Sequence, residues 1–251
     1  MRPLAELVID LQCHILPGID DGAVELEDSV EMATQGAEDG IEVICATPHI
    51  RHDHDVRIAE LAWRVDELNA ELRLREVPTR VTLGGEVAET ILEHVSDDEL
   101  RRVSLGGGGR WVLLEPAPGP LSDSLLAAVA HLSERGFGSL IAHPERHLAE
   151  DLEERLAALI ERGALVQATA AYFVAPATAP AMLELAGHGL IHVLSSDAHS
   201  ALRGRPVRLS EGIAALREID LLSPHVDWMA GTAPAAIIRG EHVEPPFAPA
   251  L

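Results

Sequence analysis

Residues that can bind metal ions recur in this sequence where short apolar stretches end. The set comprises Asp10, Gln12, His14, Asp20, Asp21, His49, Glu86, Glu115, His143, Asp197 and His199. Imidazole and carboxylate groups are common ligands of divalent cations, and no thiolate accompanies them. Brought together without a counter-charge, these groups would be costly to bury, and divalent cations would offset that cost. The pattern therefore predicts a metal centre.

Taken singly, some of these residues have a plainer interpretation. His14 or Asp197 alone could be a capped, hydrogen-bonded residue of the interior. Glu115 is harder to explain in this way, because it ends the apolar run WVLLE, where an unpaired carboxylate is expensive. Glu86 follows two glycines, which would let the backbone approach a partner closely. His143 precedes a proline, which favours an extended backbone at a strand end.

Other reactive residue types are assigned no chemistry. His52 and His54, in the charged run RHDHD, are expected to be solvated loop residues. Cys13 and Cys45 lie in apolar surroundings and are expected to be buried small residues. All 19 basic residues are arginine, which excludes a lysine nucleophile or a P-loop lysine. The histidines expected to be structural are His94, His131, His188, His192, His225 and His242.

The elements that would position these residues alternate between strand and helix. Runs of β-branched and apolar residues predict seven strands: Leu7–Gln12, Glu42–Ala46, Arg80–Gly84, Trp111–Glu115, Ser139–Ala142, Leu165–Ala168 and Ile191–Ser195. Helices are expected at Glu25–Asp39 and Val56–Glu76, and from near Ala88, Ser122, Ala149, Ala177 and Pro206. This alternation indicates parallel strands covered by helices. A closed or nearly closed α/β barrel accommodates it better than an open, doubly wound sheet, and six of the seven strand ends carry candidate ligands.

Length and composition favour one soluble domain over residues 1–251, with a poorly ordered Pro-rich tail at 244–251. Hydrophobic residues make up 47% and charged residues 24% of the chain, as in globular proteins. The formal charge of −22 argues against nucleic acid as a partner. Neither a signal peptide nor a membrane-spanning run is recognisable, so we expect a cytoplasmic protein and not an integral membrane protein.

Six segments resemble, in order, the motifs of the PHP-domain phosphoesterase family. They are DLQCHILPGIDDG (10–22), CATPHI (45–50), GGEV (84–87), LLEP (113–116), IAHPER (141–146) and SSDAH (195–199). They are most similar to the manganese-dependent protein-tyrosine phosphatases found with bacterial capsule and exopolysaccharide genes. The resemblance runs to about Arg217 and implies a distorted (β/α)7 barrel with a single PHP-type domain. It also implies a phosphatase that acts on phosphotyrosines of a membrane-associated kinase of exopolysaccharide synthesis.

The resemblance further implies a cluster of up to three Mn²⁺ ions, with Fe or Zn²⁺ as alternatives. The first ion would be held by Gln12, His14, Glu86 and Asp197, the second by Glu86, Glu115 and His143, and the third by Asp21, His49 and His199. Arg146, and less clearly Arg205, resemble arginines that bind substrate phosphate. Asp197 or His199 could protonate the leaving group if metal does not saturate it.

Gln12 is where the chain departs from the family pattern DxHxH, in which this position is a histidine. An amide oxygen can bind Mn²⁺ but is a poorer donor than imidazole toward softer metals. Gln12 could instead be a hydrogen-bonding residue behind the ligands. Two other functions stay open at this point: hydrolysis of a small phosphomonoester such as histidinol phosphate, and a degenerate barrel that binds metal or phosphopeptide without turnover.

Overall fold

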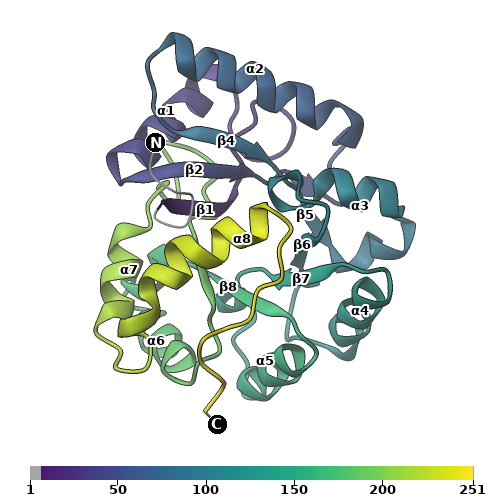
Figure 1. Ribbon diagram of the computed structural model, residues 1–251, viewed down its shortest axis with the longest axis vertical. Helices are drawn as coiled ribbons and strands as arrows, with labels where there is room; N and C mark the ends of the chain where they lie inside the picture. Colours follow the sequence, from purple (N-terminus) through teal and green to yellow (C-terminus); the bar gives the residue numbers. More distant parts are fainter. Residues whose placement is uncertain (1–6, 251) are drawn as a thin grey trace.

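The computed structural model describes residues 7–250, in which parallel strands form a curved ring (Figure 1). The strands are β1 (Val8–Cys13), β2 (Ile41–Ala46), β3 (His49–Ile50), β4 (Arg80–Leu83), β5 (Glu86–Ala88), β6 (Trp111–Glu115), β7 (Gly138–Ile141), β8 (Leu165–Thr169) and β9 (Val193–Ser195). One sheet has the order β1-β2-β4 and the other β3-β5-β6-β7-β8-β9, with parallel pairing in both. Because β2 leads into β3 and β4 into β5, the nine described segments fill seven strand positions.

The ring closes where the chain after β9 returns to β1. Cys13 forms a parallel bridge with Ala198, and the Asp197 N–H donates to the Gln12 carbonyl oxygen over 2.9 Å. Asp10 strengthens this junction, because its carboxylate accepts hydrogen bonds from the hydroxyl and the backbone N–H of Ser196 at 2.5 and 3.0 Å. The predicted distorted seven-stranded barrel is therefore confirmed.

Helices cover the outside of the ring. They are α1 (Leu26–Glu38), α2 (Leu61–Leu74), α3 (Asp97–Val103), α4 (Asp123–Glu134), α5 (Leu152–Glu161), α6 (Ala179–Gly187) and α7 (Ser210–Arg217). The helix expected from near Ala88 is divided into a 3₁₀ segment, Glu89–His94, and α3. Within residues 7–250, no helix is long and apolar enough to cross a membrane.

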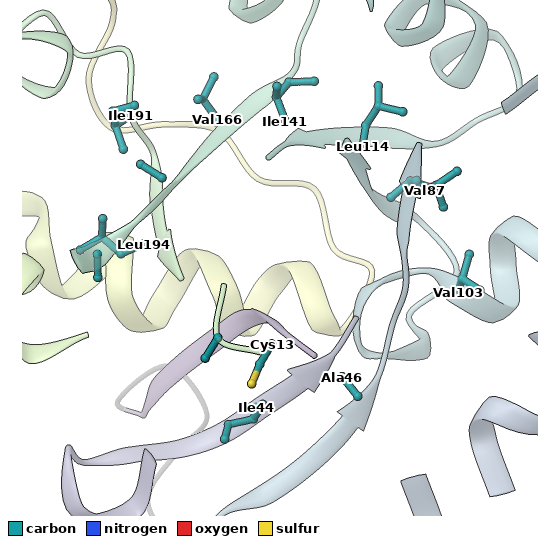
Figure 2. Close-up of a cluster of buried hydrophobic side chains, with 14 of the residues drawn as sticks. Cys13, Ile44, Ala46, Val87, Val103, Leu114, Ile141, Val166, Ile191 and Leu194 are labelled. Carbon is teal, nitrogen blue, oxygen red and sulfur yellow. The ribbon is translucent and has the colours of Figure 1, made fainter. Parts of the chain in front are cut away.

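Alternation along the strands separates two layers of the core. In β6, Val112 and Leu114 belong to the outer layer under the helices, part of which Figure 2 shows, while Trp111 and Leu113 belong to the inner cluster. Side chains two residues apart share one face of a strand. Glu115 therefore continues the inward-facing series at the end of β6.

A C-terminal helix that the sequence analysis did not predict covers the inner cluster. It begins as a π-helix over Trp228–Thr232 and continues as α8 (Ala233–Ile238), which crosses the ring in Figure 1. Ala233, Ala235, Ile237 and Ile238 pack in the same cluster as the inward-facing residues of β6. Gly106, with φ at 69°, lies so close to Ile238 that a Cβ would collide with it.

The C-terminal tail is packed, which corrects the expectation that 244–251 would be poorly ordered. Residue 251 lies outside the described residues, but Phe247 contacts the rings of His192, His225 and Trp228 at centroid distances of 5.8, 5.6 and 6.1 Å. The Ala250 N–H also donates to the backbone of residue 188. The packing of Phe247 thus holds in place a segment whose composition had suggested disorder.

Candidate metal centre

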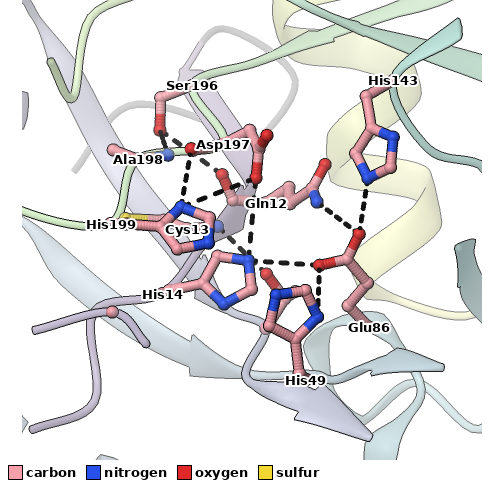
Figure 3. Close-up of polar contacts among 12 residues, drawn as sticks. Gln12, Cys13, His14, His49, Glu86, His143, Ser196, Asp197, Ala198 and His199 are labelled. Carbon is pink, nitrogen blue, oxygen red and sulfur yellow. Dashed lines mark hydrogen bonds and ion pairs between the residues drawn. The ribbon is translucent and has the colours of Figure 1, made fainter. Parts of the chain in front are cut away.

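The predicted ligands meet at the carboxyl ends of the strands, the edge where active sites of parallel α/β barrels lie (Figure 3). Most of them are buried, although the Asp21 side chain is 59% exposed. The contributing residues are Gln12 and His14 at the end of β1, His49 in β3, Glu86 in β5, Glu115 in β6, His143 after β7, and Asp197 and His199 after β9. Asp21 lies in the loop after β1.

A first ligand set consists of His14, Glu86 and Asp197. His14 Nε2 lies 3.1 Å from Glu86 Oε2 and 3.6 Å from Asp197 Oδ1. The three ligand atoms lie within 4.8 Å of one another, so one cation could contact all of them. This set contains three of the four residues expected for the first metal.

A second ligand set consists of His49, Glu86 and Glu115. His49 Nδ1 lies 3.3 Å from Glu86 Oε2 and 3.5 Å from Glu115 Oε2. His143, which we expected here, has Nε2 at 2.8 Å from Glu86 Oε1, and its assignment to the second metal stays a prediction. His49, which we expected at the third metal, also lies in this set, and Glu86 is shared with the first set.

A third ligand set consists of Asp21, His49 and His199, the residues expected for the third metal, together with His14. His49 Nε2 and His199 Nε2 each lie 3.5 Å from Asp21 Oδ1. The His14 and His199 rings stack at 3.9 Å between centroids. This set is the most open to solvent because of Asp21.

Unpartnered buried atoms show that the cluster fits divalent cations. Among residues 7–250, the buried side-chain atoms that lack a hydrogen-bond partner include His14 Nε2, His49 Nδ1, Glu86 Oε2, Glu115 Oε2 and Asp197 Oδ1. Buried polar atoms are normally hydrogen-bonded, and leaving them unpaired is costly. These five atoms are the ones that face each other in the first two sets, so metal ions would satisfy them together.

Asp20, one of the candidate metal-binding residues in the sequence but assigned there to no metal, orients His14. Its Oδ2 lies 2.8 Å from His14 Nδ1, which leaves Nε2 directed at the other ligands, as is usual for metal-binding histidines. Burial alone would lower the pKa of His14, but the contacts with Asp20 and Glu86 raise it to about 10. Burial alone would raise the pKa of Asp20, but the hydrogen bond with His14 and the charge of His14 lower it to about 2. The aspartate pair at 20–21 was the available signal for this role.

Two backbone conformations at the strand ends are unusual. His143 has φ at 36° and Asp197 at 48°, in the left-handed region that non-glycine residues rarely adopt. The extended conformation expected for His143 from the following proline is therefore wrong. Such conformations cluster at functional sites, where the surrounding structure holds them.

Gln12 points into the cluster but contacts other side chains there. Its Nε2 donates to Glu86 Oε1 over 2.8 Å, and its Oε1 accepts from Gln167 Nε2 over 2.7 Å. Gln167, in β8, was missed because its strand end carries no imidazole or carboxylate. The alternation in LVQAT places it on the same face as the inward-facing Leu165, and a polar residue at that position was the signal.

Three arginines approach the cluster from its rim. Arg146 and Arg205 both bind Asp197 Oδ2, at 2.5 and 2.8 Å. Arg51 NH1 lies 3.1 Å from Glu115 Oε1 and was not predicted, because the RHDHD run was interpreted only as a solvated loop. Their side chains are 24–35% exposed, so these guanidinium groups remain accessible to an anionic ligand.

His199, proposed as a proton donor, has properties that favour metal binding. Burial, and then the charge of His14, lower the pKa of His199 to about 4. Its imidazole is therefore neutral at pH 7 when no metal is bound, as a metal ligand must be. Asp197 Oδ2 binds two arginines, and Asp197 Oδ1 faces His14 Nε2 at 3.6 Å, so Oδ1 is the oxygen directed at the first ligand set.

Comparison with known proteins gives a consistent set of relatives. Residues 8–219 match the family described as capsular polysaccharide synthesis, CpsB/CapC. The tyrosine-protein phosphatase YwqE of Bacillus subtilis (strain 168) is 33% identical over 203 residues, which cover 77% of this chain and 78% of YwqE. The putative tyrosine-protein phosphatase CapC of Staphylococcus aureus is 27% identical over 212 residues, which cover 81% of each chain.

A solved structure extends the similarity to the fold. It comes from crystal structures of YwqE from Bacillus subtilis and CpsB from Streptococcus pneumoniae, described as unique metal-dependent tyrosine phosphatases. The TM-score is 0.82 at 28% sequence identity, and the match covers 97% of this chain and 99% of the other. A shared barrel therefore accompanies the shared sequence motifs.

Proposed function

The chain belongs to the CpsB/CapC family of capsular polysaccharide synthesis, and from this premise we propose that it is a metal-dependent tyrosine-protein phosphatase. YwqE carries that activity in its name, and the solved structures of YwqE and CpsB are described as metal-dependent. The observation in this chain that carries the proposal is the convergence of five unpartnered buried ligand atoms at one edge of the barrel. Arginines at the rim of the same cluster suit a phosphate ester.

The cluster would hold up to three metal ions, with His14 assigned to the first, His49 to the third, and Glu86 shared between the first and the second, because one neutral imidazole binds one ion. Manganese is the metal we propose, and Fe or Zn²⁺ are alternatives, because imidazole and carboxylate ligands without thiolate suit all three. When bound, such ions activate water and neutralise charge on phosphoryl oxygens. His143, whose Nε2 lies 2.8 Å from Glu86 Oε1, is the imidazole that we propose for the second ion.

Arg146 and Arg205 are the residues we assign to the substrate phosphate. A guanidinium group binds phosphate through two parallel N–H donors, a geometry that lysine does not reproduce. Both side chains now hold Asp197 Oδ2, while Asp197 Oδ1 faces His14 and the first ligand set. Asp197 therefore links the metal ligands to the phosphate-binding arginines.

The substrate we propose is phosphotyrosine in a protein, namely a membrane-associated tyrosine kinase of exopolysaccharide synthesis. A groove of about 670 Å³ beside Asp21 and His199 supports a protein substrate, because it gives room for residues next to the phosphotyrosine. Val24 and Leu202 line the groove and are 79% and 84% exposed. We also propose that the chain forms a single domain, since one ring of strands supplies the whole cluster. The cytoplasm is the site of action that we propose from the sequence analysis.

Turnover of para-nitrophenyl phosphate with and without added Mn²⁺ tests the reaction, and paired substrates test the specificity. We expect Mn²⁺-dependent turnover and a higher kcat/KM for a phosphotyrosine peptide than for histidinol phosphate. The reverse preference would indicate a small-molecule phosphatase. Metal binding without hydrolysis of any of the three substrates would indicate a barrel that binds without turnover.

A further inference from the structure

Two glutamine side chains lie end to end inside the barrel, next to Glu86. Gln12 and Gln167 are both fully buried. Gln167 Nε2 donates to Gln12 Oε1 over 2.7 Å, and Gln12 Nε2 donates to Glu86 Oε1 over 2.8 Å. Figure 3 shows the Gln12 amide directed at the Glu86 carboxylate. The two amides thus form a hydrogen-bonded chain that ends on the carboxylate shared by two ligand sets.

The direction of this chain follows from what each group can donate. A metal-binding carboxylate has no proton to give, so the Gln12 atom that faces Glu86 must be the amide nitrogen. The Gln12 oxygen then lies on the other side, and the Gln167 atom beside it must also be a nitrogen. Turning one amide alone would place oxygen against oxygen or nitrogen against nitrogen at hydrogen-bond distance, which is unfavourable in a buried site.

We propose that Gln167 is a positioning residue that holds Gln12 as a hydrogen-bond donor to Glu86, so that Gln12 is not itself a metal ligand. Glu86 Oε1 is within 2.8 Å of both Gln12 Nε2 and His143 Nε2, whereas Glu86 Oε2 is unpartnered. One carboxylate oxygen is thereby held in place and the other is presented to the metal. The inference rests on the metal-binding part of the proposed function and does not depend on hydrolysis.

The alternative arrangement, in which Gln12 binds metal through Oε1, requires a different state of both amides. Gln12 would have to turn, which breaks both of its hydrogen bonds and places its nitrogen against that of Gln167. Gln167 would then have to turn as well and accept through Oε1, an atom that is buried without a partner in the described structure. The two arrangements place the Gln12 amide protons beside different neighbours, so they can be distinguished.

Side-chain NMR of the wild-type protein makes this distinction. The sequence contains three glutamines, Gln12, Gln35 and Gln167, so ¹⁵N-glutamine labelling gives three side-chain amide pairs. A Gln35→Ala variant identifies the pair outside the cluster. When Zn²⁺, a diamagnetic probe, is added to saturation, we expect nuclear Overhauser contacts from the Gln12 amide protons to Glu86 to persist. Their loss, with new contacts from these protons to Gln167, would overturn the proposal.

Metal affinity provides a second measurement. We expect Gln167→Met to raise the calorimetric Kd for Mn²⁺ about 5- to 30-fold, because a buried hydrogen bond is lost and the Gln12 oxygen is left unpaired. Gln35→Ala, whose side chain hydrogen-bonds to the backbone of residues 201 and 207 and not to Gln12, Gln167 or Glu86, should leave this Kd unchanged. Because the two amides act as a unit, the Gln12→Met/Gln167→Met double variant should bind Mn²⁺ no more weakly than whichever single variant has the higher Kd.

An unchanged Mn²⁺ affinity in a folded Gln167→Met protein would contradict the proposal. If that variant does not fold, the NMR measurement on the wild-type protein decides alone. Neither measurement requires turnover. A protein that passes both tests but hydrolyses no phosphotyrosine would therefore refute the proposed function and leave the role of Gln167 standing.

Discussion

Lowering the pH should weaken metal binding at this cluster, because a proton and a metal ion compete for His14. The contacts of His14 with Asp20 and Glu86 outweigh its burial and raise its pKa to about 10, so its imidazole is protonated at pH 7 before metal binds. Metal binding requires the neutral imidazole. Each unit of pH below about 10 should therefore reduce the apparent affinity of the sets that contain His14 about tenfold.

The other histidines change this slope in defined directions. The contact with Glu86 outweighs burial and raises the pKa of His143, so His143 steepens the slope if metal binding deprotonates it. Burial and the charge of His14 lower the pKa of His199 to about 4, so His199 contributes no proton above pH 6. We therefore expect binding at pH 7 to release about one proton from His14.

The same shift predicts the opposite pH dependence for the stability of the metal-free protein. The folded-state pKa of His14, about 10, lies above the ordinary histidine value of 6.5. The stabilisation from protonated His14 is therefore fully present below about pH 6.5 and is lost as the pH rises through about 10. Raising the pH should thus destabilise the metal-free protein in this window while it strengthens metal binding.

Calorimetric titration of metal-free protein with Mn²⁺ at pH 6, 7 and 8 tests this reasoning. Two buffers with different ionisation enthalpies give the number of protons released. Asp20→Asn is the matched variant, since it removes one of the contacts that raise the pKa of His14 and should reduce the pH dependence. Equal affinity at pH 6 and pH 8 without proton release would refute the assignment of His14 as a protonated ligand.

Three further outcomes are expected. Arg146→Lys should lower kcat/KM for a phosphotyrosine peptide about 10- to 100-fold with unchanged metal content, since lysine cannot bind phosphate through two parallel donors; equal kinetics would remove Arg146 from the mechanism. Gly22→Ala should weaken metal binding because its Cβ would collide with the backbone of His14, whereas Gly187→Ala, with no atom within 4 Å, should not; denaturation and metal titration of both variants check this. Phe247→Ala should lower the free energy of unfolding by about 1–2 kcal/mol without changing metal affinity, and an unchanged denaturation midpoint would show that the tail does not stabilise the fold.

The strands were predictable from the sequence because each is a short apolar run with a clear end. WVLLE was predicted with the bounds it has, and the strand ends at His49 and Glu86 brought their ligands to the expected edge. Parallel pairing brings the carboxyl ends of all strands together, so residues far apart in sequence meet without any knowledge of side-chain contacts. The location of the cluster follows from this topology.

The side chains behind the ligands were harder to predict. Gln167 and Arg51 are of types that are common on protein surfaces, and their roles here depend on which partner lies within about 3 Å. The C-terminal helix was missed because WMAGTAPAAII lacks the polar face of a surface helix, and it is almost entirely buried against the inner cluster. Such assignments depend on tertiary contacts that local patterns do not encode.

The way in which the ring closes has a consequence for how the chain reaches its folded state. β1 pairs with β2 early in the chain, but it also meets residues 197–198 and packs against α8, so the first strand finds these other neighbours only when nearly the whole polypeptide is available. Contacts of such large sequence separation slow folding and leave strand edges exposed during synthesis. His14 and Asp197 lie on the two sides of this closure, so the first ligand set is assembled only when the ring is complete. Metal capture should accordingly be a late event in the maturation of this protein, and a nascent chain that ends before residue 197 would have no complete first site to fill.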